Sequence, residues 1–328
     1  MGRFNPVTCI RSNSSYRAAR PGVITCLIAG VWIAALACAG AAAQNDPAQQ
    51  DDTVLRVCAD PNNMPLSNEQ GEGYENKIAE ALAKDLGRTT QYTFFPQRMG
   101  FVRNTLRMKD PNTGAYKCDV IIGVPSKYEL TATTRPYMHS TYALVYASRQ
   151  DFDKLQTAAD LLKLPPEKRQ KLRIGVFGRS PGADWLLHNE LMDHAVFYTP
   201  QSGDPAETPA HTIEQDLAAG RIDAAIVWGP IAGLLVRKHA GERSWRAVPF
   251  MPAADIKFDY EISMGVRQGE KEWKDTLDQW IASHRAKVDE ILTSYRIPLL
   301  DAEGKLIAGL QGPEDQARAG SAPKKIPL

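Results

Sequence analysis

Apolar and polar positions along the first half of the chain alternate between short apolar runs and amphipathic segments. The apolar runs at residues 54–60, 91–95 and 118–124 predict strands, the first of which is stopped by Pro61. Between them, residues 74–87 and 100–108 carry apolar side chains at helical spacing and predict helices. This β-α-β-α-β order is typical of a doubly wound, mostly parallel sheet.

The second half of the chain repeats this order. Strands are predicted over residues 172–177, 195–199 and 222–228, with helices over 183–191 and 212–220 between them. Two such units predict an α/β protein with two lobes. Each lobe is expected to contain a doubly wound, mostly parallel sheet with flanking helices.

Extended segments connect the predicted lobes. Residues 141–150 lead out of the first lobe, and residues 245–250 and 260–266 bring the chain back. A long helix is then predicted over residues 271–295, because its apolar residues form a single stripe. In a protein of this plan, a ligand is expected between the lobes, at the carboxyl ends of the strands.

The two ends of the chain differ in composition from the rest. Residues 1–43 carry four arginines and no acidic residue, and an apolar run leads to Ala41-Ala42-Ala43, which predicts a cleaved secretory signal peptide. A membrane anchor is the alternative, although no basic stop-transfer cluster follows the run. The predicted organisation is a signal peptide (1–43), a disordered linker (44–53), a first lobe (54–148 and 258–300), a second lobe (149–257) and a flexible tail (301–328).

Cleavage of the predicted leader changes the net charge. The leader holds four of the 39 Lys and Arg residues and none of the 38 Asp and Glu residues, so the formal net charge falls from +1 to −3. The remaining chain has no block of basic residues, which argues against nucleic acid as a partner. It also has no second apolar run of bilayer-spanning length, so no membrane span is expected after cleavage.

Two of the five cysteines remain after cleavage. Cys58 and Cys118 lie in the predicted first lobe, and the other three lie in the leader. An even number of cysteines in an exported protein favours a disulfide bond. In the chain-entropy model such a bond would stabilise the fold by about 4 kcal/mol. Two buried free thiols are the alternative.

Residues 178–182, GRSPG, match the G-x-S-x-G pattern between a strand and a helix, and Asp223 and His239 follow in the order of a hydrolase triad. The oxyanion hole of such an enzyme uses the backbone N–H that follows the serine, and Pro181 has none. We therefore interpret Ser180 as a helix N-cap with Pro181 at the first helical position. A helix start of this kind could also bind an anion or a polar ligand group.

Other candidate chemistry is sparse. Asp60, Asn62 and Asn63 follow the first strand and either cap a turn or face a ligand cleft, and both interpretations stay open. His188 and His194 are six residues apart, which is a poor spacing for metal ligands on one helix face. The chain contains no CxxC, HExxH or phosphate-binding P-loop motif. We therefore expect neither a metal nor a cofactor.

The chain resembles the type II periplasmic solute-binding proteins. Within them it is similar to the branch found with pyrroloquinoline-quinone (quinoprotein) alcohol dehydrogenases, the methanol oxidation system protein J family (MoxJ/XoxJ). The most specific motifs are VCADPNNMP, CDVIIGVP and AIVWGPIAG, within a resemblance that spans residues 54–300. It implies a periplasmic location and no enzyme activity.

Two positions depart from the amino-acid-binding relatives within this superfamily. The resemblance implies that those relatives hold the ligand carboxylate with an arginine after the third strand, where this chain has Lys127. They hold the ligand ammonium with an acid at the end of the last strand of the second lobe, where this chain has Trp228-Gly229. An apolar, aromatic floor is therefore expected in place of an ionic clamp, unless Trp228 packs inward and another residue makes the clamp.

The resemblance implies an accessory protein that binds a quinoprotein methanol or alcohol dehydrogenase and assists its maturation or activation. The alternative is the substrate-binding component of an ABC transporter, with a small solute and a permease as partners; a hydrolase using Ser180 is a third hypothesis. The candidate ligand- or partner-binding cleft comprises Asp60, Asn62, Asn63, Tyr74, Arg98, Phe101, Lys127, Tyr137, Tyr142, Ser180, Trp185, Trp228, Gly229 and Tyr260.

Overall fold

The structure of the protein is a computed structural model that describes residues 52–148, 152, 154–199, 208–240, 245–253 and 255–310. The chain divides into two units, residues 1–45 and 46–328, and all described residues belong to the second unit. The predicted signal peptide therefore lies outside the described residues, as do residues 44–51 of the linker and 311–328 of the tail.

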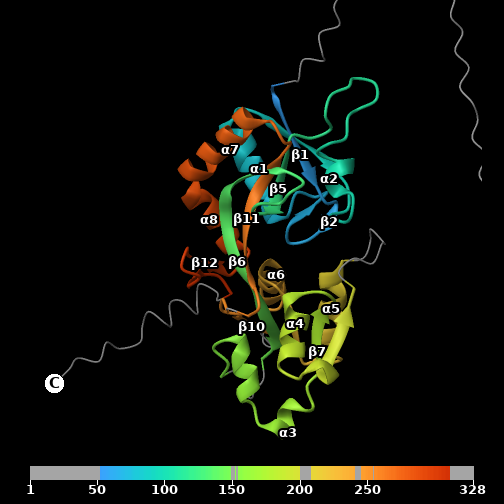
Figure 1. The fold of residues 1–328 in the computed structure, drawn as a ribbon, viewed down its shortest axis with the longest axis vertical. Helices are drawn as coiled ribbons and strands as arrows, with labels where there is room; N and C mark the ends of the chain where they lie inside the picture. The colour runs from blue at the N-terminus through green and yellow to red at the C-terminus, as the bar shows by residue number, and fades with distance from the viewer. Residues whose placement is uncertain are drawn as a thin grey trace, which may run out of the picture. The chain divides into compact units, whose positions relative to one another are not determined.

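The first lobe contains the predicted β-α-β-α-β unit. β1 (Val54–Ala59) pairs in parallel with β4 (Thr89–Phe94) on one side and with β5 (Val120–Pro125) on the other. α1 (Tyr74–Asp85) connects β1 to β4, and the short α2 (Phe101–Asn104) lies between β4 and β5 (Figure 1). Because α1 buries Ile78 and Leu82, its apolar stripe packs into the core as the helical spacing predicts.

One long strand joins the two lobes. β6 (Ala132–Ala147) pairs through residues 132–141 with β11 (Asp259–Val266), next to β5. Its later residues, 142–147, pair with β9 (Ala224–Trp228) and β10 (Trp245–Pro249) of the second lobe. Figure 1 shows β6 passing from one lobe into the other. The strand order is β4-β1-β5-β11-β6-β9-β7-β8, so the parallel parts are linked by antiparallel strands.

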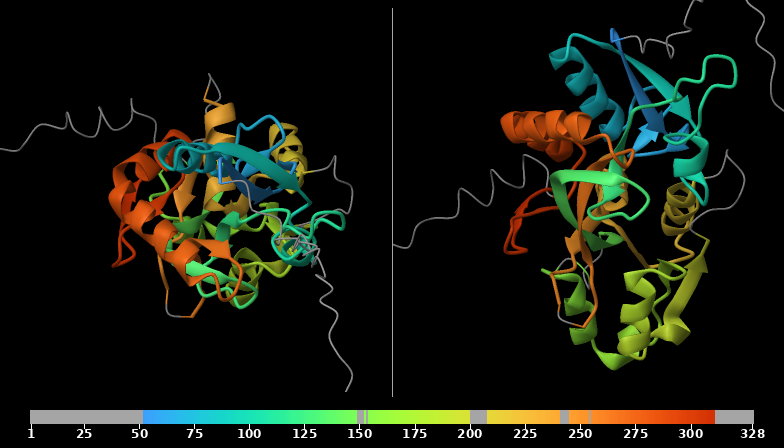
Figure 2. Two further views of the ribbon diagram at one scale, coloured as in Figure 1. Left: turned by 90° about the horizontal axis from the view of Figure 1, so that it is seen from above. Right: turned by 45° about the horizontal axis from the view of Figure 1, so that its top comes forward.

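The second lobe also has a parallel sheet with flanking helices. β7 (Ile174–Phe177) pairs in parallel with β9 and with β8 (Ala195–Tyr198). The connecting helices are α4 (Pro181–His188) and α5 (Pro209–Ala218), and α6 (Gly229–Lys238) follows β9 directly (Figure 2). The predicted two-lobed α/β fold is confirmed.

Buried apolar residues form separate clusters in the two lobes. The largest cluster draws on residues 55–138 and 264–299 and includes Leu82, Met264 and Trp280. Two clusters in the second lobe draw mainly on residues 143–258 and cover the two faces of its sheet. Leu310, beyond the main elements, packs into one of these second-lobe clusters.

Several elements differ from the sequence-based prediction, and among them are α6 and the short strands β12 (Leu299–Leu300) and β13 (Leu306–Ala308), which the sequence did not predict. The helix predicted over residues 271–295 is two helices, α7 (Lys271–Ser283) and α8 (Arg285–Ser294). The break follows Ser283, whose hydroxyl donates to the carbonyl of Gln279 (2.9 Å), a bond that bends helices. Further elements that the sequence did not predict are α3 (Pro166–Arg169), two 3₁₀ helices (Ala158–Lys163 and Met192–His194), and the hairpin of β2 (Asn62–Asn63) and β3 (Ser67–Asn68).

Residues 301–310, which the sequence analysis assigned to a flexible tail, are part of the ordered fold. β12 (Leu299–Leu300) pairs with β6 and with β13 (Leu306–Ala308), and Leu310 is buried. The physical reason is the apolar content of residues 306–310, which lets this segment bury side chains against the second lobe.

Helix α6 packs unusually close to the backbone of its neighbours. A Cβ atom at Gly229 would lie 2.4 Å from the carbonyl oxygen of Thr141, and one at Gly233 would lie 2.4 Å from that of Tyr295. Only glycine fits such an approach. The first turns of α6 are therefore held against β6 and against the segment that follows α8.

Candidate functional site

Three aromatic side chains meet where β6 passes into the second lobe. Tyr142 of β6 lies directly opposite Trp228 of β9, with ring centroids 5.4 Å apart. Tyr260 of β11 completes the group, 6.4 Å from Tyr142 and 5.9 Å from Trp228. We call these three residues the aromatic triad. Tilted and edge-on pairs at such separations are favourable contacts between π systems.

The aromatic triad is only partly exposed. Trp228 is half-buried and packs against the core of the first lobe, although it belongs to a second-lobe strand. Burial, and secondarily the neighbouring Tyr260, raises the pKa of Tyr142 to about 12. The carboxyl end of β9 is thus occupied by an aromatic group that contacts both lobes, and Trp228 itself packs inward against the first-lobe core.

A cavity of about 520 Å³ adjoins the triad through Tyr260. Its charged residues have both signs: Arg179 and Lys257 against Asp184 and Asp255. Lys257 lies over the Tyr260 ring, 5.5 Å from its centroid. The remaining lining residues are Pro181, Leu187, His188 and Ile256. The cavity has no excess of one charge sign, so it does not favour a small anion over a small cation.

The start of α4 at this cavity confirms the N-cap interpretation of Ser180. Its hydroxyl accepts the N–H of Ala183 (3.4 Å) and donates to the carbonyl of Phe177 (2.7 Å), and Pro181 occupies the first turn. Ser180 is buried and these bonds occupy its hydroxyl. Because Pro181 has no N–H and the N–H of Ala183 is capped, this helix start offers few donors to an anion.

The other residues of the hydrolase hypothesis are occupied elsewhere. The Asp223 carboxylate accepts the backbone N–H of Arg173 (2.8 Å), and the His239 imidazole contacts Glu214 (2.8 Å) and stacks on Trp245. Among the described residues, no hydrogen bond joins Ser180 to a histidine. The G-x-S-x-G match is therefore a capped helix start.

The polar residues after β1 form a structured hairpin. The Asp60 carboxylate accepts the backbone N–H groups of Asn62 (2.8 Å) and Gln97, and the Asn63 side chain donates to the Gln97 side chain (3.0 Å). Ser67 closes the turn through its bonds to the Asp60 backbone. These contacts support the turn interpretation of Asp60 and Asn63. Asn62 is exposed.

Four of the candidate aromatic residues lie in cores. Tyr74 and Tyr137 are 1% and 0% exposed in the first-lobe core, so neither presents a face to a partner. Phe101 packs beside the disulfide bond, and Trp185 packs edge-on against Phe250 in the second lobe. Helical and strand periodicity do not distinguish such residues from groove residues.

An unpredicted buried carboxyl group lies beside Tyr137. Glu75 is 6% exposed at the start of α1, and its Oε1, like the Tyr137 hydroxyl, is buried without a hydrogen-bond partner among the described residues. It packs so closely on Gly123 that a Cβ atom there would lie 2.1 Å from Oε1. Burial, and then Asp60, raises the pKa of Glu75 to about 8, so the group is mainly protonated at neutral pH.

The two candidate cations of the first lobe are exposed. Arg98 lies over the Phe95 ring (6.0 Å), and Lys127 has a left-handed backbone (φ 64°) in the loop after β5. Neither belongs to the cavity beside the aromatic triad. Gly229, the last candidate, is buried at the start of α6.

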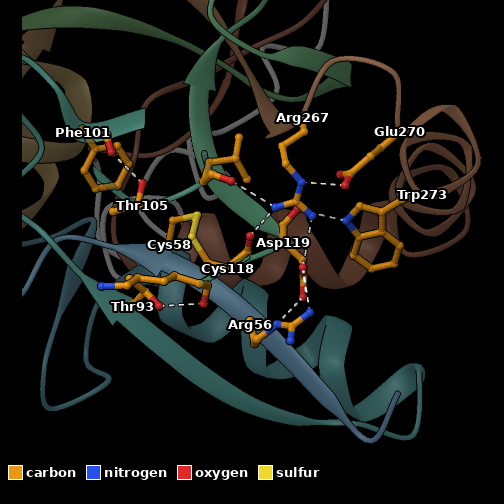
Figure 3. The surroundings of a disulfide bond; sticks show 12 residues. Arg56, Cys58, Thr93, Phe101, Thr105, Cys118, Asp119, Arg267, Glu270 and Trp273 are labelled. Carbon is orange, nitrogen blue, oxygen red and sulfur yellow. Dashed lines mark hydrogen bonds and ion pairs between the residues drawn. A yellow bond between two sulfur atoms is a disulfide. The ribbon is translucent and has the colours of Figure 1, made fainter. Parts of the chain in front are cut away.

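Cys58 and Cys118 form the disulfide bond that the even cysteine count favours, with Cα atoms 5.4 Å apart. Beside it, Asp119 accepts from Arg56 (3.0 Å) and from Arg267 (3.2 Å) (Figure 3). This network fixes the start of β5 to β1.

In the part of the chain that is described, no three His, Cys, Asp or Glu side chains are placed to hold a metal ion. None of its helices is long and apolar enough to cross a membrane.

Comparisons with known proteins agree with this architecture. No protein-family model matches the chain. It is 29% identical to protein MoxJ of Paracoccus denitrificans over 286 residues, which cover 83% of this chain and 96% of that protein. Its sequence is 31% identical to that of periplasmic binding protein XoxJ from Methylobacterium extorquens AM1. The crystal structure of that protein matches this structure with a TM-score of 0.59, and the match covers 75% of this chain and 99% of that chain.

A third protein, MxaJ from Methlophaga aminisulfidivorans MPT, has a TM-score of 0.59 at 24% identity, covering 75% of this chain and 100% of its own. At that identity it supports the fold alone. Two α/β lobes joined by β6 and β11, together with these structures, define a type II periplasmic binding protein. The match to XoxJ identifies the family within this class of proteins. The chain belongs to the MoxJ/XoxJ family of periplasmic binding proteins.

Sequence reasoning missed the residues that shape the cavity. Arg179 adopts a left-handed backbone (φ 60°) before Ser180, and Lys257 and Asp255 come from a loop before β11. Nothing in the local pattern of that loop places it beside α4. The sequence also does not indicate that Glu75 is buried, because an acidic residue in the first turn of a helix is common.

Proposed function

We propose that this protein is a periplasmic, non-catalytic accessory of a quinoprotein methanol or alcohol dehydrogenase, which it binds during maturation or activation. Two observations support the proposal: membership of the MoxJ/XoxJ family, and the aromatic triad at the carboxyl end of β9. The aromatic triad is the more important of the two observations, because aromatic side chains stand where the amino-acid-binding relatives are expected to have a charged clamp. Aromatic side chains suit an apolar segment of a protein.

An amino acid placed on the aromatic triad itself would lack charged partners for its carboxylate and ammonium groups, and unpaired charges are costly to bury. The charged side chains of Arg179, Asp184, Asp255 and Lys257 line the adjoining cavity. Trp228, Tyr142 and Tyr260 are partly exposed, contact one another through their rings and carry no formal charge at neutral pH. Trp and Tyr are also the residue types that dominate binding energy in protein interfaces.

The structural comparisons support a periplasmic location, since the XoxJ structure is that of a periplasmic binding protein. The predicted signal peptide over residues 1–43 fits this location. We retain residues 54–148 with 258–300, and residues 149–257, as the proposed extents of the two lobes.

A substrate-binding component of an ABC transporter is the second candidate. The fold and the cavity of about 520 Å³ beside Tyr260 favour it. A solute present at a hundredfold excess over its Kd would stabilise the protein by ~2.7 kcal/mol. A thermal-shift panel of amino acids, small acids, alcohols and pyrroloquinoline quinone distinguishes the candidates, because the accessory role predicts a flat response.

The direct test is a titration of purified quinoprotein methanol dehydrogenase with the mature protein, followed by sedimentation velocity. We expect a complex, and we expect the double variant Trp228→Ala/Tyr260→Ala to weaken it about tenfold or more, as loss of interface aromatics does. Phe197→Ala is the control, because Phe197 is an exposed aromatic outside the triad, on the edge strand β8, which β7 separates from β9. Absence of a complex, together with a solute that raises the melting temperature, would favour the transport role.

A further inference from the structure

We propose that the two lobes are held in one relative orientation, so that the aromatic triad and the adjoining cavity stay accessible and the lobes do not close over a ligand. The contacts responsible join α6 of the second lobe to the first lobe, and we call them the α6 seam. They are made by Gly229, Gly233 and Arg237, which lie on one face of the helix because each is four residues from the next. The inference goes beyond the proposed function and does not rest on it.

The α6 seam begins where the helix meets β6. A Cβ atom at Gly229 would lie 2.4 Å from the carbonyl oxygen of Thr141 and 2.8 Å from the hydroxyl oxygen of Ser140. Ser140 also donates its hydroxyl to the carbonyl of Pro298 (2.7 Å), which ties β6 to the segment after α8. The start of α6 therefore lies directly on the backbone of β6 at the junction of the lobes (Figure 1).

Further along α6, the seam contacts the end of α8. A Cβ atom at Gly233 would lie 2.4 Å from the carbonyl oxygen of Tyr295 and 2.6 Å from that of Arg296. One turn later, the Arg237 guanidinium lies over the Tyr295 ring (4.6 Å) and donates to the carbonyl of Ser294 (3.5 Å). Tyr295 is buried in the first-lobe core. The seam thus joins α6 to two different elements of the first lobe, over about 12 Å of helix.

Residues 309–310 reinforce the seam. Leu310 donates its backbone N–H to the carbonyl of Arg296 (3.2 Å), while its side chain is buried in a second-lobe cluster. Leu310 (φ 61°) and Arg296 (φ 55°) both have left-handed backbones, which residues other than glycine rarely adopt. Such conformations persist only where the surrounding structure holds them. This bonded pair therefore fastens the first-lobe segment after α8 to the second lobe.

Rotation of one lobe against the other would have to break these contacts. If β6 and β11 alone joined the lobes, bending of a few residues in the two strands would allow closure. Here the same rotation would separate α6 from Thr141 on β6 or from Tyr295 at the end of α8, where backbones are in direct contact. Close-packed interfaces adopt discrete arrangements and do not deform continuously. A receptor that encloses a solute needs this motion, whereas a surface that binds a protein does not.

The test is the distance between the lobes, measured by double electron–electron resonance between two nitroxide labels. The labels are attached at Lys84→Cys on α1 and at Glu167→Cys on α3, which are exposed positions in different lobes. Cys58 and Cys118 are bonded to each other and buried, so they do not react with the label. Distances are recorded for the mature protein alone and with each solute of the thermal-shift panel.

Two variants weaken the α6 seam. Gly233→Ala adds a Cβ atom against the carbonyl of Tyr295. Arg237→Ala removes the contact with the Tyr295 ring and changes only an exposed side chain, so this variant is expected to fold even if the first does not.

Each seam variant has a matched control within the second lobe. Gly182→Ala also adds a Cβ atom to a tightly packed helix, 2.6 Å from the side chain of Ile226, but it leaves the seam intact. Lys238→Ala removes the cation next to Arg237 on α6, which pairs with Glu214 of α5 (2.7 Å). Circular dichroism verifies that each variant folds.

We expect one narrow distance distribution for the wild type, unchanged by every solute. Each seam variant that folds should broaden this distribution or shift its maximum by more than about 2 Å, the scale of domain rearrangements, while the controls leave it unchanged. A broad or two-peaked distribution for the wild type, a shift caused by a solute, or seam variants that match the wild type would each overturn the inference. The proposed function would then still stand or fall on the titration with the dehydrogenase.

Discussion

Tyr142 and Trp228 face each other across the antiparallel pair of β6 and β9, in direct register and with ring centroids 5.4 Å apart. Tyr142 lies where β6 changes partners from β11 to β9. Trp228 packs at the same time against the first-lobe core and against Tyr260 of β11. The two residues therefore connect three strands at the junction of the lobes.

Replacing Trp228 by Ala should lower the free energy of unfolding by about 2 kcal/mol, below the usual cost for a fully buried tryptophan because Trp228 is only half-buried. A double-mutant cycle with Tyr142→Ala should give a coupling of about 1 kcal/mol, as expected for a direct aromatic pair. Urea denaturation measures both quantities. A coupling indistinguishable from zero would mean that the rings do not interact in solution.

The buried carboxyl group of Glu75 should make stability fall as pH rises. Its folded pKa, about 8, lies above the value of about 4.5 expected for an unfolded glutamate, so the native state binds more protons between these pH values. Stability linked to this group is fully present below about pH 4.5 and is lost as pH rises toward 8. The difference is on the order of a few kcal/mol.

Glu75→Gln should remove this part of the pH dependence and stabilise the protein relative to the wild type at pH 8 and above. The measurement is the urea midpoint from pH 5 to 9 for the wild type and the variant. Glu80→Gln, an exposed change on the same helix, is the control. Parallel curves for the wild type and Glu75→Gln would show that Glu75 is ionised throughout.

Reduction of the disulfide bond should destabilise the first lobe. Cys58 and Cys118 are 60 residues apart, a loop whose closure contributes about 4 kcal/mol in the chain-entropy model. We expect dithiothreitol to lower the urea midpoint of the wild type. The double variant Cys58→Ala/Cys118→Ala should not respond to dithiothreitol. An unaffected wild-type midpoint would mean that the thiols are not bridged in the protein as isolated.

Gly233→Ala should destabilise the protein, although the same change in an exposed helix stabilises it by roughly 1 kcal/mol. The added Cβ would lie 2.4 Å from the carbonyl oxygen of Tyr295, so the backbones must move apart, at a cost of about 1–3 kcal/mol. Gly178→Ala is the control, because a Cβ added there would meet no atom of a more distant residue within 4 Å. A gain in melting temperature for Gly233→Ala would show that α6 is not clamped against the segment after α8.

Ser180→Ala should cost about 1 kcal/mol of stability through loss of the cap of α4. We expect the wild type to show no turnover of p-nitrophenyl esters, since Ser180 is a buried cap and is followed by Pro181. Ester hydrolysis by the wild type that disappears in Ser180→Ala would revive the hydrolase hypothesis.

The order of strands and helices could be predicted from the sequence because each signal is local. Gly87 ends α1 in the left-handed conformation (φ 67°) that its position implies, and Ser180 with Pro181 starts α4. Helix α6 was not predicted, because the strand pattern of residues 222–228 runs straight into Gly229-Pro230. Its stability comes from packing against β6 and residues 295–296, which no local signal reveals.

The candidate site could be predicted only in part, for the same reason. Tyr142, Trp228 and Tyr260 lie on three strands, and only their pairing in the sheet brings them together. Tyr74 and Tyr137 are aromatic residues that the sequence pattern does not distinguish from the members of the triad, but their side chains are buried in the core. The cavity beside Tyr260 depends on how residues 255–257 lie against α4, which is a tertiary relationship.

The central claim is that this protein serves a quinoprotein dehydrogenase, and native co-purification tests it most directly. The mature protein would be isolated from the periplasm of alcohol-grown cells under non-denaturing conditions, and every bound species identified by mass spectrometry. We predict a quinoprotein dehydrogenase in near-stoichiometric amount, with recovery that falls for Trp228→Ala/Tyr260→Ala. A bound small solute without any dehydrogenase would contradict the claim and make the aromatic triad a ligand-stacking surface.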